Sequence, residues 1–392
     1  MRRALIVLAT VLLGHAGAHP ATAAGEASES IDALRTELEA LREIVADLEA
    51  QVARTRPSLH SFRLPEAMAF AGQPVPLDRW DVAERLEREF YLALAGPAQV
   101  VLWLKRSGRY FPYIEERLRA AGLPDDLKYV AVVESALQPR ALSWARASGI
   151  WQFIDGTARR YGMRVTAAWD ERRDPARSTA AAIAYLRDLH ARFRDWPLAL
   201  AGYNAGQGRV ETALREQGVA DYYRLALPAE TERYVFRVLA AKLILEAPGR
   251  YGFEVAPQER YAPHATATVT VTVTGHLLVR ELASAAGSFY REIRTLNPAI
   301  AGDRLPTGRY AVRIPESGRA RFATALPGLE RVMAARAVRR VTYRVQRGDT
   351  LGGIARRFGV SVDALRRGNA AARRAHLRPG DLLVIERARV EE

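Results

Sequence analysis

The chain has 392 residues, a formal net charge of +14 and no cysteine. This length is enough for two or three domains of about 100–200 residues, and the positive charge suggests an anionic partner: nucleic acid, a membrane surface or an acidic polymer. Without cysteine we expect no disulfide scaffold, no zinc–thiolate site, no cysteine nucleophile and no lipid-modified N-terminal cysteine. The seven histidines are scattered, so we expect no metal site. We expect no cofactor either.

The first 24 residues have the pattern of a signal peptide. Arg2 and Arg3 precede an apolar run from Ala4 to Leu13, and Ala21-Thr22-Ala23 offers an A-x-A cleavage site. The run is shorter than the ~20 residues that a membrane-spanning helix needs, and a retained anchor is the alternative. We therefore expect residues 1–24 to be removed and the mature protein to reside in the periplasm or cell envelope, which counts against nucleic acid as a partner.

Residues 28–54 carry a heptad repeat, and a linker is expected at residues 55–77. Apolar side chains alternate at spacings of three and four, as in a coiled-coil seam: Ile31, Leu34, Leu38, Leu41, Val45, Leu48 and Val52. The repeat predicts either a short coiled coil that forms a homo-oligomer or one amphipathic helix folded onto its own chain. Prolines at 57, 65, 74 and 76 then predict a break in regular structure.

Residues 78–250 show helical periodicity and no convincing strand. Apolar residues at helical spacing place helices around 86–94, 114–118 and 127–134. Further helices are expected at 181–193, 198–204 and 229–245. The pattern therefore predicts an all-α domain.

The rest of the chain contains two copies of one small module, at residues 266–315 and 341–387. In the first copy, Thr and Val or Ala alternate from Thr266 to Thr274, which predicts a strand; two helical stretches and a second strand follow. The plan recurs at an offset of 72 residues, which pairs Asn297 with Asn369. Both copies are therefore predicted to be β-α-α-β modules.

The second copy resembles a LysM domain in three segments: Tyr343 to Leu351, Ile354 to Val360 and Leu377 to Asp381. A glycine at 348 suits a tight turn, and Asp349 or Thr350 can cap the helix that follows. The resemblance implies binding to glycans that contain N-acetylglucosamine, such as peptidoglycan; a spacer without a ligand is the alternative. The first copy has Gly275-His276-Leu277-Leu278 in place of the signature, so we expect it to be degenerate and its glycan binding to be weak or absent.

A candidate catalytic acid ends the apolar run Tyr129-Val130-Ala131-Val132-Val133-Glu134-Ser135. Burial raises the pKa of a carboxyl group because desolvation disfavours the charged form. A carboxylic acid that stays protonated near neutral pH can protonate a leaving-group oxygen. An ordinary glutamate at a helix end is the alternative for Glu134 alone.

Four segments in order resemble lytic transglycosylases of the lysozyme-like superfamily, specifically the membrane-bound type D kind, which carries C-terminal LysM repeats. These segments are Glu134-Ser135, Ser143 to Phe153, Gly202 to Gly206 and Glu230 to Val235. The resemblance implies a mainly α lysozyme-like catalytic domain, followed by small α+β LysM-type modules and preceded by the short coiled-coil helix. It also implies cleavage of peptidoglycan glycan strands, with no nucleic acid as partner.

The resemblance implies that Glu134 is the single general acid, which later acts as the base. The resemblance places six further residues along the glycan cleft: Ser143, Gln152, Tyr203, Asn204, Glu230 and Tyr234. Two positions depart from the family, because Arg146 stands where glycine is favoured and Gly202 replaces the usual alanine. A hydrolase of the same fold (a muramidase) and a non-catalytic wall-binding scaffold are the alternatives.

The number of catalytic carboxylates predicts the product. Glycosidases normally use two carboxylates, whereas the four segments supply only Glu134 as a clear acid; nothing in the pattern places Asp155 or Asp170 at the site. The N-acetyl group of the substrate can stabilise the positive charge instead, and the tethered C6 hydroxyl can attack C1. We therefore expect cleavage of the MurNAc-β-1,4-GlcNAc bond with 1,6-anhydroMurNAc ends.

Overall fold

The computed structural model describes residues 34–47, 62–337, 339–373 and 377–387. The chain divides into two compact units, Met1–Arg63 and Leu64–Glu392. The predicted signal peptide, residues 1–24, lies outside the described residues, so its prediction stands untested. No helix in the described part of the chain has the length and apolar character needed to cross a membrane.

The first unit contains a helix at residues 34–47. Its heptad side chains Leu34, Leu38, Leu41 and Val45 are exposed. The other heptad positions lie outside the described residues. Coiled-coil formation therefore remains a prediction.

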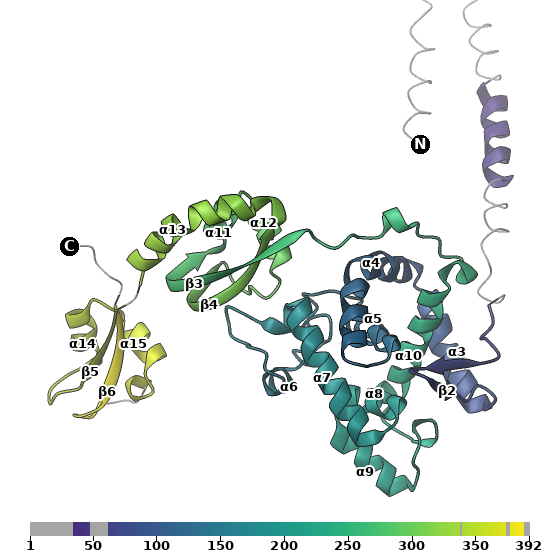
Figure 1. Cartoon of the computed structure of the whole chain (residues 1–392), viewed down its shortest axis with the longest axis horizontal. Coiled ribbons are helices and arrows are strands. Elements are labelled where there is room, and N and C mark those ends of the chain that lie inside the picture. The colour runs from purple at the N-terminus through teal and green to yellow at the C-terminus, as the bar shows by residue number, and fades with distance from the viewer. Residues whose placement is uncertain (1–33, 48–61, 338, 374–376, 388–392) are drawn as a thin grey trace, which may run out of the picture. The chain divides into compact units, whose positions relative to one another are not determined.

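The second unit begins with a helical domain, as predicted (Figure 1). A short antiparallel hairpin precedes it, β1 (Met68–Phe70) and β2 (Gln73–Val75), inside the segment expected to be a linker. The α-helices are α3 (Trp80–Leu94), α4 (Pro97–Ala120), α5 (Lys128–Ser135), α6 (Asp155–Arg160), α7 (Pro175–Phe193), α8 (Trp196–Ala205), α9 (Gln207–Gln217) and α10 (Ala229–Glu246). Short 3-10 helices lie at Asp125–Leu127, Glu171–Arg173, Tyr222–Arg224, Pro248–Tyr251 and Pro257–Glu259.

Helix α10 is the centre of this domain, because it packs against α3, α5 and α8. Its side chains Val235, Val238 and Leu239 are fully buried. Helix ends follow local sequence: Asp174 and Asp195 accept hydrogen bonds from the first amides of α7 and α8, and proline occupies the first turn of both. Helix α5 ends because Ala136 adopts a left-handed conformation with φ 52°.

The middle module comprises residues 266–335. Its strands β3 (Thr266–Leu278) and β4 (Arg304–Pro315) are antiparallel, with Val271 opposite Tyr310. The helices α11 (Val279–Ala285) and α12 (Tyr290–Leu296) lie between the strands in sequence, which confirms the predicted β-α-α-β order. After the 3-10 helix Glu316–Gly318, an additional helix, α13 (Arg319–Ala335), packs on β3.

The C-terminal module, residues 339–387, has the same order of elements: β5 (Arg339–Arg344), α14 (Leu351–Phe358), α15 (Val362–Gly368), the 3-10 helix Ala371–Arg373 and β6 (Leu382–Arg387). Thr350 caps α14 by accepting a hydrogen bond from Gly353 N, which settles the choice between Asp349 and Thr350. Gly359 ends the helix with φ 66°.

The paired asparagines of the two modules make the same side-chain hydrogen bonds. Asn297 Nδ2 donates to Ile293 O at 2.9 Å and to Arg313 O at 2.6 Å, and its Oδ1 accepts from Arg313 N at 2.7 Å. Asn369 makes the same three bonds to Leu365 and Val384. Each buried amide therefore joins the second helix of its module to the second strand, and the predicted fold class is confirmed.

Candidate active site

Glu134 lies on the last turn of α5, where the apolar residues before it anchor the helix in the core. Val130, Ala131 and Val132 are fully or almost fully buried, and α5 packs on α10. The Glu134 carboxylate accepts a hydrogen bond of 2.5 Å from the hydroxyl of Tyr234. Tyr234 comes from α10 and is 1% exposed, so the partner of the acid is held rigidly.

The environment of Glu134 suits a proton donor. Desolvation raises the pKa of Glu134 to about 7, and the negative charge of Glu230 adds to this rise. The hydrogen bond from Tyr234 and the positive charge of Arg237 lower the pKa and only partly offset the burial. A substantial fraction of Glu134 is therefore protonated near neutral pH.

Tyr203 lies on the last turn of α8, close enough to Glu134 for the charge of the acid to act on its hydroxyl. Its hydroxyl donates to Trp151 O at 2.7 Å. Burial, and then the charge of Glu134, raise the pKa of both Tyr203 and Tyr234 well above the usual tyrosine value. Both phenols therefore stay neutral and keep their hydroxyl protons as hydrogen-bond donors.

The loop at residues 141–153 reaches α5 from the other side. Ser135 Oγ donates to Ile150 O at 2.9 Å. Gln152 has φ 49°, and its side-chain amide donates to Gly149 O at 2.7 Å. Ser143 is exposed at the tip of the loop, and its hydroxyl accepts a hydrogen bond from Ala147 N at 3.0 Å. Arg146 adopts φ 60°, a left-handed conformation that explains why glycine suits this position.

Of the predicted residues, Tyr234 hydrogen-bonds Glu134, and Tyr203 lies close enough to be influenced by its charge. Asn204 follows Tyr203 on α8 and is partly exposed. Glu230 begins α10 in an exposed position and accepts a hydrogen bond of 2.6 Å from Arg237 Nη2.

Arg237 is a residue that the sequence reasoning missed. It lies one helical turn after Tyr234 on α10, its guanidinium is 5.8 Å from the centroid of the Tyr234 ring, and its charge acts on Glu134. Its Nε is buried without a hydrogen-bond partner among the described residues. The i, i+3 spacing from Tyr234 is a signal that could have identified it.

No cluster of three or more His, Asp or Glu side chains suited to a metal ion occurs in the described ranges. The two other carboxylates considered from the sequence are both paired with arginine. Asp155 binds Arg159 at 2.6 Å on the surface of α6, and Asp170 is buried against Arg172 at 2.7 Å.

Comparison with known proteins identifies two parts of the chain. Residues 112–225 match the family model of the transglycosylase SLT domain, and residues 343–386 match that of the LysM domain. The SLT match contains Glu134, Tyr203 and the loop between them. Tyr234 lies beyond its end.

The membrane-bound lytic murein transglycosylase D of Escherichia coli K12 is 32% identical over 294 residues, which cover 71% of this chain and 64% of the relative. This chain thus spans slightly less than two thirds of that relative. The membrane-bound lytic murein transglycosylase F of Alcanivorax borkumensis is 36% identical over 95 residues, covering 22% of this chain and 19% of that protein. A solved structure, the 70 kDa soluble lytic transglycosylase of Escherichia coli, aligns with 23% identity and a TM-score of 0.32, over 47% of this chain and 36% of its own.

Proposed function

Because this chain contains a transglycosylase SLT domain and a C-terminal LysM domain, we propose that it is a lytic transglycosylase that cleaves the MurNAc-β-1,4-GlcNAc bond of peptidoglycan. The observation that carries the proposal is the single carboxyl group with a pKa near 7, hydrogen-bonded to a buried tyrosine at the end of an SLT-domain helix. The names of the relatives point to the same class of enzyme.

In the first step Glu134 donates its proton to the glycosidic oxygen, and the bond from that oxygen to C1 of MurNAc breaks. The positive charge that develops at C1 is stabilised by the carbonyl oxygen of the sugar's own N-acetyl group. Tyr234 then stabilises the carboxylate that Glu134 has become, because its hydroxyl already donates to Glu134 Oε1. General acid catalysis of this kind commonly contributes ~10²–10⁴-fold.

In the second step the Glu134 carboxylate takes the proton of the C6 hydroxyl, and O6 forms a bond to C1. The acid is thereby restored, no water is consumed, and the product is a 1,6-anhydroMurNAc end. Tethering gives the C6 hydroxyl a high effective concentration relative to water. The six further residues Ser143, Gln152, Tyr203, Asn204, Glu230 and Tyr234 are proposed to line the glycan.

A hydrolase normally uses a second carboxylate as a nucleophile or to activate water. The ion pairs of Asp155 and Asp170 with arginine, described above, favour the transglycosylase, because neither carboxylate is left without a partner. Glu230 is engaged by Arg237.

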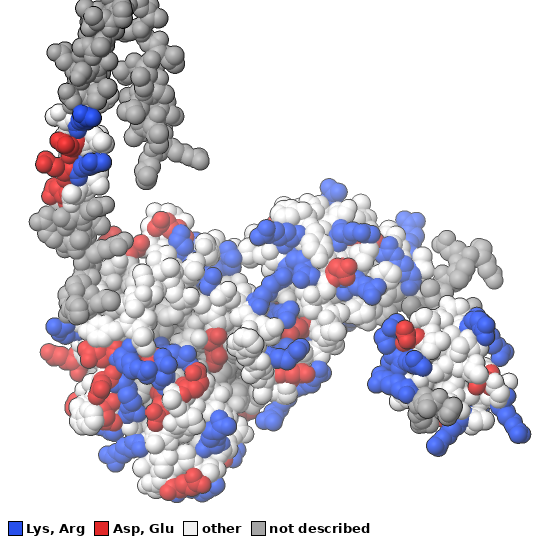
Figure 2. Space-filling view, turned by 180° about the vertical axis from the view of Figure 1, so that it is seen from behind, with Lys and Arg blue, Asp and Glu red and all other residues white. Residues whose placement is uncertain are grey.

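The C-terminal module is proposed to hold the enzyme on the wall by binding glycan. Export to the periplasm through residues 1–24 and homo-oligomerisation through residues 28–54 are proposed from the sequence patterns alone. The positive charge of the chain suits an anionic wall polymer, and Figure 2 shows Lys and Arg predominating over Asp and Glu on the middle and C-terminal modules. No cofactor is required.

The proposal is tested by Glu134→Gln in a gel that contains peptidoglycan. Gln is close in shape but has no acidic proton, so the variant should fold and leave no cleared zone, a loss of at least ~10²-fold. Asp155→Asn is the matched control and should clear the gel like the wild type. Clearing by Glu134→Gln would contradict the assignment of the acid, and a wild-type protein that clears nothing would favour the scaffold.

A further inference from the structure

The middle module is anchored on the helical domain by a tryptophan that the domain contributes to the module's core. Trp169 lies in the loop before α7 and is 4% exposed among the core residues of the module. Its ring centroid is 5.0 Å from that of Tyr310 on β4. The Arg164 guanidinium lies 5.3 Å from the Trp169 ring centroid and 4.6 Å from that of Tyr310.

Backbone hydrogen bonds and an ion pair reinforce this contact. Asp170 N donates to Ala299 O at 2.8 Å, and Ala301 N donates to Ala168 O at 2.9 Å. Arg313 of β4 donates to both carboxylate oxygens of Asp174, at 2.6 and 3.0 Å. Asp174 is 6% exposed and also caps α7, so the module is tied to a helix start of the domain.

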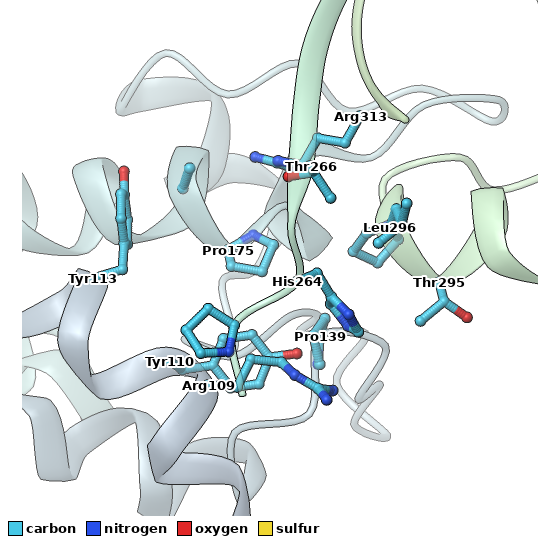
Figure 3. A pocket seen from close by; sticks show the side chains of 13 residues that line it. Arg109, Tyr110, Tyr113, Pro139, Pro175, His264, Thr266, Thr295, Leu296 and Arg313 are labelled. Carbon is cyan, nitrogen blue, oxygen red and sulfur yellow. The ribbon is translucent and has the colours of Figure 1, made fainter. Parts of the chain in front are cut away.

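A cavity of about 280 Å³ lies along the same junction (Figure 3). Tyr113 and Pro175 of the helical domain line one side, and Thr266 and Arg313 of the module line another. Arg313 therefore forms part of the junction, and its charge is neutralised by Asp174.

The docked segment, residues 164–174, also supports the active-site loop. Arg172 is buried and bonds both oxygens of Asp170, at 2.8 and 2.7 Å. Its Nη1 donates to Arg146 O at 2.8 Å and to Phe153 O at 3.1 Å, at the two ends of the loop's inner half. A Cβ at Gly149 would lie 1.8 Å from Arg172 O, so the segment and the loop are in direct backbone contact.

The inner half of the loop, residues 146–153, contacts the catalytic centre on its opposite side. Ile150 O accepts from Ser135, the neighbour of Glu134, and Trp151 O accepts from Tyr203. Hydrogen bonds therefore link the module to residues 168–170, Arg172 to the loop at 146–153, and that loop to Ser135 and Tyr203.

We infer that the middle module is a positioning element of the active site rather than a second glycan-binding module, and that Arg313 and Trp169 are its anchoring residues. The inference rests on the proposed function. The module's stretch 299–301, which precedes its second strand, is occupied by bonds to residues 168–170 of the domain. Its lack of the LysM signature fits this role, because a module used for docking does not need to keep a sugar site.

The test uses the full chain with Arg313→Met, which keeps the length of the side chain and removes the pair with Asp174. We expect kcat on sacculi to fall by about ten- to a hundredfold, since a misplacement of catalytic groups by about 1 Å can cost ~10²-fold. KM and sacculus retention should stay within twofold. Arg313→Lys should restore part of kcat, because an ammonium can keep one of the two bonds. Arg304→Met, at an exposed position of the same strand, is the matched control and should behave as the wild type.

Hydrogen exchange gives a readout that does not depend on activity. The amides of Ser148 and Gly149, which are hydrogen-bonded to Phe153 O and Ala141 O, should exchange faster in Arg313→Met and unchanged in Arg304→Met. The double variant Trp169→Ala/Arg313→Met removes both anchors and should increase both effects. If the double variant has the same loop amide exchange rates and the same kcat as the wild type, the inference is overturned. A wild-type chain without activity would instead refute the proposed function, and the exchange rates alone would then decide the inference.

Discussion

At the scale of single residues, the account depends on the proton of Glu134. Burial raises its pKa to about 7, and the nearby Tyr234, Arg237 and Glu230 adjust that value in opposite directions. The carboxyl group must be protonated to act as an acid. Activity should therefore be present below neutral pH and decline as the pH rises through about 7.

Substitutions of Glu230 and Arg237 should shift the alkaline limb of the pH–activity profile, the decline through about pH 7, in opposite directions. Arg237→Gln removes a positive charge that lowers the pKa of Glu134, so the limb should shift to higher pH. Glu230→Gln removes a negative charge that raises the same pKa, so the limb should shift to lower pH. Profiles of kcat/KM against pH measure both shifts, and shifts of the same sign would show that the pair acts through structure instead of charge.

The same raised pKa makes Glu134 a source of instability in alkaline solution. A carboxyl group whose pKa is higher in the folded state stabilises the fold fully below its unfolded pKa, and this contribution is lost as the pH rises through the folded value. Glu134→Gln should therefore raise the free energy of unfolding at pH 8 relative to the wild type, by on the order of 1–3 kcal/mol. The difference should shrink at pH 4, and a constant difference in urea unfolding at both pH values would contradict the assigned pKa.

The site residues predicted from the sequence belong to short contiguous motifs. Glu134 and Tyr203 lie in such motifs, and the structure brings Tyr234, 100 residues from Glu134, into direct contact with the acid. Trp169 gave no signal, because its role depends on contacts with a module that follows more than 100 residues later. Arg172 gave none because its partners outside its own turn are the backbone carbonyls of Arg146 and Phe153. No local periodicity reports such a contact.

At the scale of elements, the β-α-α-β modules were predicted in the correct order because Thr/Val alternation and glycine turns are local signals. Helix α13 was missed: it contains Pro327, and its apolar face is narrow, with Phe322, Leu329 and Met333 as its buried residues. The hairpin Met68–Val75 was missed because Pro74 argues against a strand. A proline is tolerated there because the hairpin has only two short strands.

The paired asparagines allow the two modules to be tested separately. Asn369→Ala leaves three backbone groups of the C-terminal module, Leu365 O, Val384 O and Val384 N, without their side-chain partner. Each loss costs about 1–3 kcal/mol, so retention on sacculi should fall while kcat on short soluble glycans is unchanged. Asn297→Ala makes the equivalent change next to Arg313 and should lower kcat while retention is preserved. Pull-down assays and initial rates on both variants give the comparison, and identical phenotypes would contradict the division of labour.

At the scale of the whole molecule, we propose that the chain separates retention on the wall from the cleavage reaction. The C-terminal module has its own core, formed by residues such as Ile354, Leu365 and Ile385, and it matches a LysM domain. The middle module shares its core with the helical domain through Trp169. We therefore expect the two copies of one fold to serve different purposes, because the copy without the LysM signature is the one that contacts the helical domain.

The central claim is that Glu134 works without a second carboxylate, and the products of sacculus digestion test it most directly. Mass spectrometry of the released muropeptides should find 1,6-anhydroMurNAc ends, which are lighter than reducing ends by one water. Fragments with ordinary reducing ends would contradict the account, because they would show that water, and not the C6 hydroxyl, attacks C1.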